Sequence, residues 1–353
     1  MNDILANCKH ILIIKLRYLG DSIWMLPFVE NLKRNLPHIK ITVLVNDGTE
    51  AFFKTCPAVS NIVTFPRKEI KSKPWGIVRL LSFLKEFRKL KPDAVIEMTD
   101  GDRAALLSYF SGAPVRIGYN NENRWRNRLS THTIRSKMDV KHMVDYQLDI
   151  LRELGLPIFS DRINIPVDPS YVHSLKKRYP SLASEDKRPK IVVHPGARNS
   201  LRQWGADNFA SLCDALSGTG RVYLVAGPDE GEVLDAVVKR MKSRPEICTH
   251  TLTLFELAAL CELADLYIGN DTGPLHIASA KTFVVGLYGP TLSKLAGPWT
   301  REKLIFESPP LYCRPCKQEE CINEEFKACL NTISPQKVTE KIGDLLSKWG
   351  GTG

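Results

Sequence analysis

Apolar residues in this chain alternate between short continuous runs and helical stripes, and the alternation occurs twice. Residues 11–14 read Ile-Leu-Ile-Ile, which is typical of a central parallel strand covered on both faces. A stripe from Ile23 to Leu36 predicts a helix after this strand, with Ser22 as its N-cap, and a second stripe between 77 and 90 predicts another. Further strands are predicted at 41–45, 61–65 and 94–98. The first half is therefore predicted to contain βαβ units and a parallel sheet.

The alternation stops in two places. The polar, basic stretch 116–141 predicts a long surface loop, and the stretch 171–189, rich in Pro, Ser and charge, predicts a linker. The pattern then restarts, with strands predicted at 191–194, 222–226, 266–269 and 284–288. Helices are predicted at 208–216, 230–241, 254–263, 275–280 and 336–349. We expect two doubly wound, Rossmann-like α/β domains that face each other across a cleft.

The expected domain boundaries follow from these breaks. Residues 1–170 form an N-terminal domain, 190–333 a C-terminal domain, and 334–353 a final helix that returns towards the N-terminal domain. A length of 353 residues with 43% apolar and 25% charged residues fits two ordinary globular domains and excludes disorder and fibrous repeats. The sequence shows neither an apolar run of membrane-spanning length nor a signal peptide, so we expect a cytoplasmic protein.

Charge adds one point about partners. The net charge is +10, and most of this excess lies in the first half of the chain. A basic domain favours an acidic partner, and nucleic acid, anionic lipid and phosphorylated substrates all remain open on charge alone.

Four polar loops follow predicted strands, where ligands of doubly wound sheets bind. In the first, Gly20-Asp21 places a carboxylate at the start of a helix, either as a helix cap or as a group that faces substrate. In the second, His194-Pro-Gly-Ala-Arg198 and Arg202 suit a phosphate-binding turn, although a solvated surface loop is the alternative. In the third, Glu230 opens a helix and has the chemistry to bind ribose hydroxyls.

The fourth loop is the most specific. The segment Gly269-Asn-Asp-Thr-Gly-Pro-Leu-His276 ends a strand and begins a short helix. Backbone N–H groups at Thr272 and Gly273 are suited to a diphosphate, and His276 lies one turn further along the same face. A capped helix with a buried structural histidine is the alternative.

Taken together and in this order, the motifs resemble the lipopolysaccharide heptosyltransferase family, in particular its heptosyltransferase III-like branch. The matching segments are Ile-Ile-Lys-Leu-Arg-Tyr-Leu-Gly-Asp at 13–21, His-Pro-Gly-Ala-Arg at 194–198, Ala-Gly-Pro-Asp-Glu at 226–230, Asn-Asp-Thr-Gly-Pro-Leu-His at 270–276 and Tyr-Gly-Pro-Thr at 288–291. The resemblance implies a glycosyltransferase B fold. It also implies inverting transfer of heptose from ADP-heptose to a lipopolysaccharide inner-core acceptor.

The resemblance also implies roles for individual residues. Asp21 falls on the catalytic base, which takes the proton of the acceptor hydroxyl. Donor-binding positions fall on Arg202, Glu230, Asp271, Thr272, Gly273 and His276. Arg202 stands where many members have lysine, so its charge is kept but its geometry differs. These residues supply positive charge and N–H donors to the leaving diphosphate, so we expect a metal-independent enzyme.

The implied acceptor accounts for the basic first half of the chain. A lipid-linked inner-core oligosaccharide carries phosphates and carboxylates, so an enzyme that uses it is expected to be peripheral on the inner face of the inner membrane, with no nucleic-acid partner. Candidate acceptor contacts are Lys15, Arg17, Arg67, Lys68 and Arg116.

A cysteine cluster near the C-terminus stands apart from these motifs. Cys313, Cys316, Cys321 and Cys329 begin with a zinc-like Cys-x2-Cys pair, but the remaining spacings fit no standard zinc module. Reduced thiols without metal are favoured over zinc and over a disulfide.

Two other functions remain open. The first alternative is a glycosyltransferase that uses another sugar nucleotide. The second, less favoured, is a two-lobed protein that binds a nucleotide or sugar without reacting. An Asp21→Ala variant separates an enzyme from a binder, because only an enzyme has turnover to lose.

Overall fold

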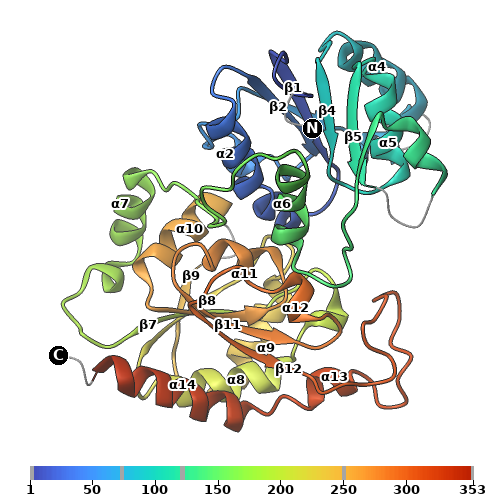
Figure 1. Cartoon of the computed structure of the whole chain (residues 1–353). Coiled ribbons are helices and arrows are strands. Elements are labelled where there is room, and N and C mark those ends of the chain that lie inside the picture. Colours follow the sequence, from blue (N-terminus) through green and yellow to red (C-terminus); the bar gives the residue numbers. More distant parts are fainter. Residues whose placement is uncertain (1–3, 72–74, 120–123, 249–251, 351–353) are drawn as a thin grey trace. The chain divides into compact units, whose positions relative to one another are not determined.

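A computed structural model describes residues 4–71, 75–119, 124–248 and 252–350. The chain divides into two compact units, Met1–Pro166 and Val167–Gly353. Each unit has one six-stranded, fully parallel sheet with helices on both faces, as predicted (Figure 1). The two units are described separately below.

The first unit is built around a central strand that is buried from Ile11 to Lys15. Its strands are β1 (His10–Lys15), β2 (Lys40–Asn46), β3 (Asn61–Phe65), β4 (Ala94–Glu97), β5 (Val115–Tyr119) and β6 (His132–Ile134), in the spatial order β3-β2-β1-β4-β5-β6. Its helices are α1 (Leu19–Trp24), α2 (Leu26–Asn35), α3 (Arg67–Lys71), α4 (Gly76–Arg88), α5 (Asp102–Phe110) and α6 (Met143–Glu153). Leu12 and Ile14 of β1 join the apolar cluster of α4 and α5, so the alternate residues Ile11 and Ile13 point to the other face.

Two predictions for this unit were wrong. The helix predicted from Ile23 to Leu36 is two helices, α1 and α2, which meet at Met25, since Pro27 at the start of α2 cannot donate a helical hydrogen bond. Ser22 lies inside α1, and Tyr18 is the N-cap residue. The stretch 116–141 is also not simply a loop, because it contains most of β5 and all of β6.

The second unit repeats the design. Its strands are β7 (Lys190–His194), β8 (Arg221–Val225), β9 (Glu246–Cys248), β10 (Leu266–Asn270), β11 (Phe283–Tyr288) and β12 (Lys303–Glu307), in the order β12-β11-β10-β7-β8-β9. Its main helices are α7 (Pro169–Arg178), α8 (Ala206–Leu216), α9 (Gly231–Arg240), α10 (Leu254–Leu263), α11 (Gly273–Ala278) and α14 (Pro335–Gly350), with the short helices α12 (Ser293–Ala296) and α13 (Ala328–Asn331). The central strands and the helices α8 to α11 and α14 were predicted, whereas α7 and the edge strands β9 and β12 were missed.

The ends of this unit differ from the sequence-based picture. The predicted linker 171–189 contains most of α7, whose Arg178 forms an ion pair with Glu256 of α10 at 2.8 Å. The apolar face of α14 (Val338, Ile342 and Leu346) is buried in the core of the second unit. Both segments therefore belong structurally to the second unit.

Candidate active site

Asp21 lies in the first turn of α1, directly after the carboxyl end of β1. Its Oδ2 accepts a hydrogen bond from the Tyr18 backbone N–H at 3.4 Å, so it does help to cap the helix. The same side chain is 21% exposed. A carboxylate that caps a helix through one oxygen and still reaches solvent can also accept a proton from a bound hydroxyl.

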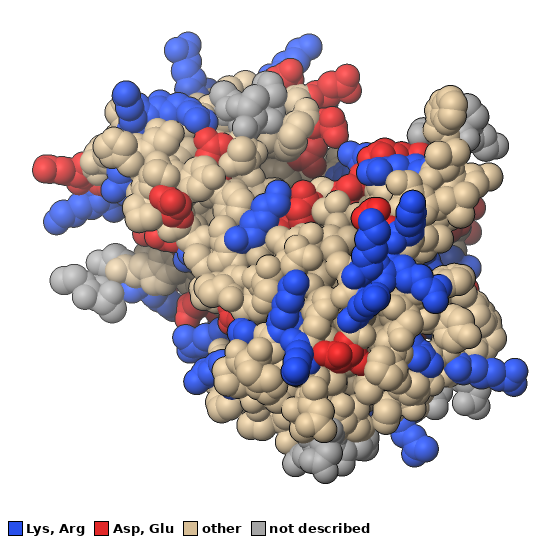
Figure 2. Space-filling view, turned by 90° about the horizontal axis from the view of Figure 1, so that it is seen from above, with Lys and Arg blue, Asp and Glu red and all other residues tan. Residues whose placement is uncertain are grey.

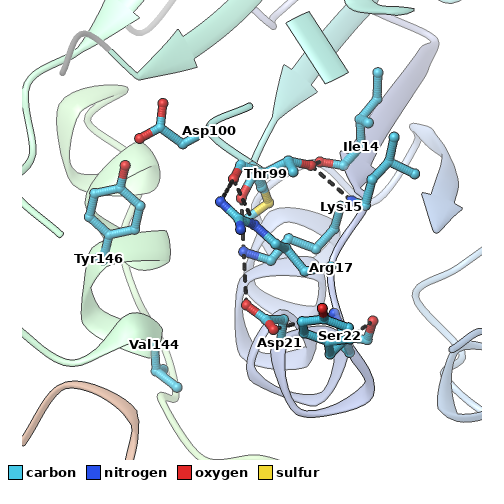
Figure 3. A network of polar contacts seen from close by, with 12 residues as sticks. Ile14, Lys15, Arg17, Asp21, Ser22, Thr99, Asp100, Val144 and Tyr146 are labelled. Atoms are coloured by element: carbon cyan, nitrogen blue, oxygen red, sulfur yellow. Dashed lines mark hydrogen bonds and ion pairs between the residues drawn. The ribbon is translucent and has the colours of Figure 1, made fainter. Parts of the chain in front are cut away.

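Lys15, the last residue of β1, lies on the buried side of this carboxylate. Its side chain is only 1% exposed, its Nζ donates to the Met98 carbonyl at 2.8 Å, and Nζ is 4.0 Å from Asp21 Oδ1 (Figure 3). Burial lowers the pKa of Lys15, and the neighbouring Asp21 opposes this fall. The ammonium group thus faces a carboxylate within the protein.

The segment after β4 is hydrogen-bonded to the loop between β1 and α1. Thr99 accepts from the Leu16 backbone N–H through its hydroxyl and from the Arg17 guanidinium through its carbonyl, at 2.8 Å and 3.0 Å (Figure 3). Glu97 accepts the backbone N–H groups of Thr99 and Asp100 at 2.6 Å and 3.0 Å. Burial raises the pKa of Glu97 to about 7.

Asp100 and Asp102, which have the spacing of a metal-nucleotide motif, bind an arginine instead. Arg126 is buried and donates to Asp100 Oδ1 at 2.6 Å and to Asp102 Oδ1 at 3.2 Å. Among the described residues, no group of three or more His, Cys, Asp or Glu side chains is arranged to hold a metal ion.

The candidate acceptor contacts are spread over the first unit. Arg67 and Lys68 begin α3 just after β3, at the same edge of the sheet as Asp21. Arg17 is half-buried and bound to Thr99, and Lys15 is enclosed. Arg116 lies near the amino end of β5, where its guanidinium donates to the carbonyls of Leu129 and Ala113. Arg116 therefore lies near the amino ends of the parallel strands, whereas Asp21 lies near their carboxyl ends.

In the second unit, Glu230 is held between two loops. His194 Nε2 and Glu230 Oε2 are 2.8 Å apart, and the Gly227 backbone N–H donates to the same oxygen at 2.7 Å. Burial alone would raise the pKa of Glu230, but the bonds from His194 and Gly227 outweigh it and lower the pKa. A side chain at Gly196 would overlap the Glu230 carboxylate, so glycine is required for this close approach.

Asn270, the last residue of β10, fastens the neighbouring loops to one another. Its Nδ2 donates to the carbonyls of Pro195 and Gly196 at 2.8 Å and 3.1 Å, and its Oδ1 accepts from the Trp204 N–H at 3.1 Å. The side chain is fully buried. The turn after β7 and the turn after β10 are thereby held as one surface.

Asp271 is the centre of a charged group at this edge. Arg202 lies 3.1 Å from Asp271 Oδ2, the Thr291 hydroxyl donates to the same oxygen at 2.6 Å, and His276 Nε2 is 3.9 Å from Oδ1. Arg202 also donates to Gln318. The structure thus brings together Arg202, Asp271 and His276, three of the predicted donor-binding residues.

Thr272 and Gly273 form the start of α11. Thr272 is the N-cap residue, Gly273 is the first helical residue, and both are partly exposed. The first backbone N–H groups of a helix have no partner within it, so this turn presents donors to an anion.

The four C-terminal cysteines line one small cavity with Arg314, Ile322 and Lys327. All are free thiols. The Cys316 and Cys321 sulfurs accept backbone N–H groups from Gln318 and Lys327 at 3.2 Å and 3.3 Å. The segment is therefore ordered by its own hydrogen bonds, and through Gln318 it supports Arg202.

The quoted motifs contain His194, Asn270 and Thr291, but none of the three was given a role. Gln318 and Arg126 were missed. His194 and Asn270 could have been found, because each ends a predicted strand beside a loop already identified. Arg126 and Gln318 carried no such signal, since their partners lie far away in sequence.

Solved structures define the class of protein. The chain aligns with the crystal structure of the glycosyl transferase family 9 from Veillonella parvula with a TM-score of 0.84 and 25% identity, covering 96% of this chain and 98% of that one. It aligns with Escherichia coli heptosyltransferase WaaC with ADP with a TM-score of 0.72 and 18% identity, covering 95% and 99%. The fold is that of the two-domain glycosyltransferase B class, as predicted.

The family follows from the sequence. Residues 80–327 match the model of glycosyltransferase family 9 (heptosyltransferase), and the chain belongs to this family. It is 28% identical over 336 residues to lipopolysaccharide heptosyltransferase 3 of Escherichia coli K12, covering 93% of this chain and 96% of that protein. It is 31% identical over 338 residues to lipooligosaccharide heptosyltransferase 2 of Campylobacter jejuni subsp. jejuni serotype O:2, with the same coverage. The resemblance drawn from the motifs is confirmed, and the protein is a glycosyltransferase.

Proposed function

We propose that this enzyme transfers heptose from ADP-heptose to the inner core of lipopolysaccharide. The observation that carries the proposal is the group Arg202, Asp271 and His276 beside the partly exposed start of α11. It combines cations and backbone donors at the carboxyl ends of parallel strands, where a nucleotide diphosphate binds. The names of the relatives, lipopolysaccharide and lipooligosaccharide heptosyltransferases, support heptose as the sugar and this glycolipid as the acceptor.

The donor is proposed to lie across the loops of the second unit. Glu230, kept ionised by His194 and Gly227, accepts hydrogen bonds from the ribose hydroxyls. The N–H groups at Thr272 and Gly273 bind the diphosphate, and Arg202 and His276 offset its charge. Asp271 cannot itself attract phosphate, so we assign it to the sugar hydroxyls and to the orientation of Arg202.

The proposed reaction is a single inverting displacement. Asp21 takes the proton from an acceptor hydroxyl as that oxygen bonds to the anomeric carbon. The bond between the anomeric carbon and the diphosphate oxygen breaks, and ADP leaves with the electron pair. No metal ion is part of this proposal, because the side chains and N–H groups above supply the positive potential that the leaving group needs.

The acceptor is proposed to bind the first unit. Arg67 and Lys68 lie at the same sheet edge as Asp21 and suit the acidic groups of a lipid-linked inner-core oligosaccharide. We assign Arg17 to the shape of the loop around Asp21, and Lys15 to the orientation of the Asp21 carboxylate. We place the enzyme on the cytoplasmic face of the inner membrane, where such an acceptor is made accessible to a soluble donor.

Two measurements test this proposal. The purified enzyme should release ADP from ADP-heptose in the presence of a heptose-deficient inner-core acceptor, and Asp21→Asn should lower kcat by ~10²–10⁴ while ADP affinity stays close to wild type. Thermal shifts with a panel of nucleotide sugars test the donor. A preference for uridine nucleotides would point to another sugar nucleotide, and binding without turnover would point to a non-catalytic binding protein.

A further inference from the structure

One helix of the first unit exposes an unusual row of large apolar side chains. On α4 and the residue before it, Trp75 is 72% exposed, Ile77 73%, Val78 59% and Leu81 61%. Scattered exposed apolar residues are ordinary, but four within seven residues form a contiguous apolar area.

These residues are exposed although the helix is firmly attached. Phe83 and Phe87 are buried on the opposite face of α4, where Phe83 packs edge-on against Phe65 at 5.2 Å. A side chain at Gly76 would overlap the Ile70 carbonyl, so α4 begins in close contact with α3. The exposed row is therefore a fixed face of a packed helix.

The surroundings of this row are basic. The described residues of α3, α4 and the two residues that flank α4 carry seven basic side chains against two acidic ones (basic: Arg67, Lys68, Lys71, Arg79, Lys85, Arg88 and Lys89). Both acidic side chains are already paired, Glu69 with Arg79 at 2.5 Å and Glu86 with Lys89 at 2.8 Å. Lys and Arg are interspersed with Asp and Glu over the face shown in Figure 2, so basic charge alone does not mark a site.

The order of side chains along α4 matches a membrane interface. The exposed face is apolar in its first two turns and basic in its last two, where Lys85 and Arg88 continue the line of Ile77 and Leu81. Amphipathic helices bind anionic bilayers in this way, with apolar and Trp side chains below the headgroups and Lys or Arg at the phosphates. A second copy of the chain would bring the same positive charge against itself, which disfavours self-association through this face.

We infer that α4 is the membrane-docking surface of this enzyme and that its partner is an anionic phospholipid bilayer. Trp75, Ile77, Val78 and Leu81 enter the interfacial layer, and Lys85 and Arg88 contact lipid phosphates. The inference deepens the proposed function, on which it rests for a lipid-linked acceptor. Among the described residues, no helix is both long and apolar enough to cross a membrane.

Sedimentation with vesicles tests the inference. The wild type should bind vesicles of phosphatidylethanolamine and phosphatidylglycerol, and the double variant Ile77→Asp/Leu81→Asp should bind at least tenfold more weakly. The matched control is Ile322→Asp in the second unit, which changes a residue that is 62% exposed and should not alter binding. Equal binding by the wild type and the double variant would overturn the inference.

The basic part of the surface has its own control. Lys85→Glu/Arg88→Glu should weaken binding to the anionic vesicles and reduce its salt dependence, whereas Lys341→Glu on α14 should not. Wild-type binding to pure phosphatidylcholine vesicles should be weak. Binding that is equally strong to both vesicle types would contradict a role for lipid phosphates.

Two further readouts identify the occupant and separate this inference from the proposed function. Brominated lipid should quench wild-type tryptophan fluorescence, and Trp75→Phe should remove most of this quenching. The Ile77→Asp/Leu81→Asp variant should transfer heptose normally to a delipidated, soluble acceptor but slowly to acceptor in vesicles. Conversion of a wild-type dimer to a monomer by the same substitutions, with vesicle binding unchanged, would identify a second copy as the partner instead.

Discussion

Lys15 shows how one buried cation is accommodated at the end of a central strand. Its ammonium has left water, which disfavours the charged form, and the Met98 carbonyl and the Asp21 carboxylate compensate in part. Burial of a lysine here costs free energy that an apolar side chain of similar size would not cost. We therefore interpret Lys15 as the residue that keeps the Asp21 carboxylate oriented.

Replacement of Lys15 tests this interpretation. Lys15→Met removes the ammonium group that orients the Asp21 carboxylate, so kcat should fall by ~10²-fold, which is the usual cost of a misplaced reacting group. ADP affinity should stay close to wild type, because the proposed donor loops belong to the second unit. The measurements are kcat, ADP affinity and the melting temperature. A fall in ADP affinity and melting temperature together with activity would show a merely structural role for Lys15.

Glu97 supports a second prediction, about stability. The pKa of this buried carboxyl rises from 4.5 to about 7, so the folded protein holds its proton more tightly than the unfolded chain. Stability should therefore fall as the pH rises from about 4.5 to about 7 and change no further above that range.

Glu97→Gln should remove this dependence. The amide oxygen of the variant can still accept hydrogen bonds from the backbone N–H groups of Thr99 and Asp100. The free energy of unfolding of the variant should be roughly 2–3 kcal/mol higher than that of the wild type at pH 8. At pH 4.5 the difference should nearly vanish. Denaturant titrations at both pH values measure it, with the exposed Glu86→Gln as the control. A gain that is the same at both pH values would contradict the assignment.

At the residue level, the sequence indicated which positions carry chemistry but not how they are held. Asp21, Glu230 and Asp271 were identifiable because each follows a predicted strand. The ion pair between Lys15 and Asp21 was not identified, because Lys15 was a candidate for acceptor binding. The pair between Arg126 and Asp100 was not identified either, because it depends on the packing of segments that are distant in sequence.

At the level of elements, the edge strand β3 and all central strands except β5 were predictable, whereas β5 and the edge strands β6, β9 and β12 were not. A strand buried on both faces gives a continuous apolar run, as in β1 and β10. The edge strands β6, β9 and β12 are short and partly exposed, so their residues show neither a run nor a clear alternation. Their pairing is determined by the sheet they join.

The turn after β7 gives a prediction at this scale. Gly196→Ala would push the Glu230 carboxylate away from His194 and the Gly227 N–H, because the new methyl group would occupy its position. We expect ADP affinity to fall by about tenfold, as one charge-assisted hydrogen bond is worth roughly 1.5–3 kcal/mol. Glu230 is a flexible side chain, so the fold should persist.

Gly231→Ala is the matched control for this experiment. It adds the same methyl group at the residue after Glu230, where nothing lies within 4 Å of the new atom. Calorimetry with ADP should give near wild-type affinity for Gly231→Ala. Equal losses in the two variants would show that the effect comes from helix α9 and not from contact with Glu230.

At the scale of the whole molecule, each unit has its own closed core. One cluster joins β1, α4 and α5, and another joins β7, α8 and α14. Because the proposed donor loops all belong to the second unit, ligand binding should stabilise the two units unequally.

Calorimetric unfolding tests this independence. ADP at one hundred times its dissociation constant should stabilise the second unit by about 2.7 kcal/mol and leave the transition of the first unit in place. Glu97→Gln should move only the transition of the first unit. The two effects together identify which transition belongs to which unit. A single transition that moves as a whole with ADP would show that the two units unfold together.

The order of strands in both sheets has a consequence for synthesis on the ribosome. In each sheet the first strand to be made, β1 or β7, is a central one. Two or three later strands then add outwards on each side, in the order in which they leave the ribosome: β2 and β3 and then β4 to β6, or β8 and β9 and then β10 to β12. Among the strands that the structure describes, none has to enter between two that are already paired. Each unit of the enzyme can therefore grow from its centre during translation, and the first unit can be complete before the second has left the ribosome.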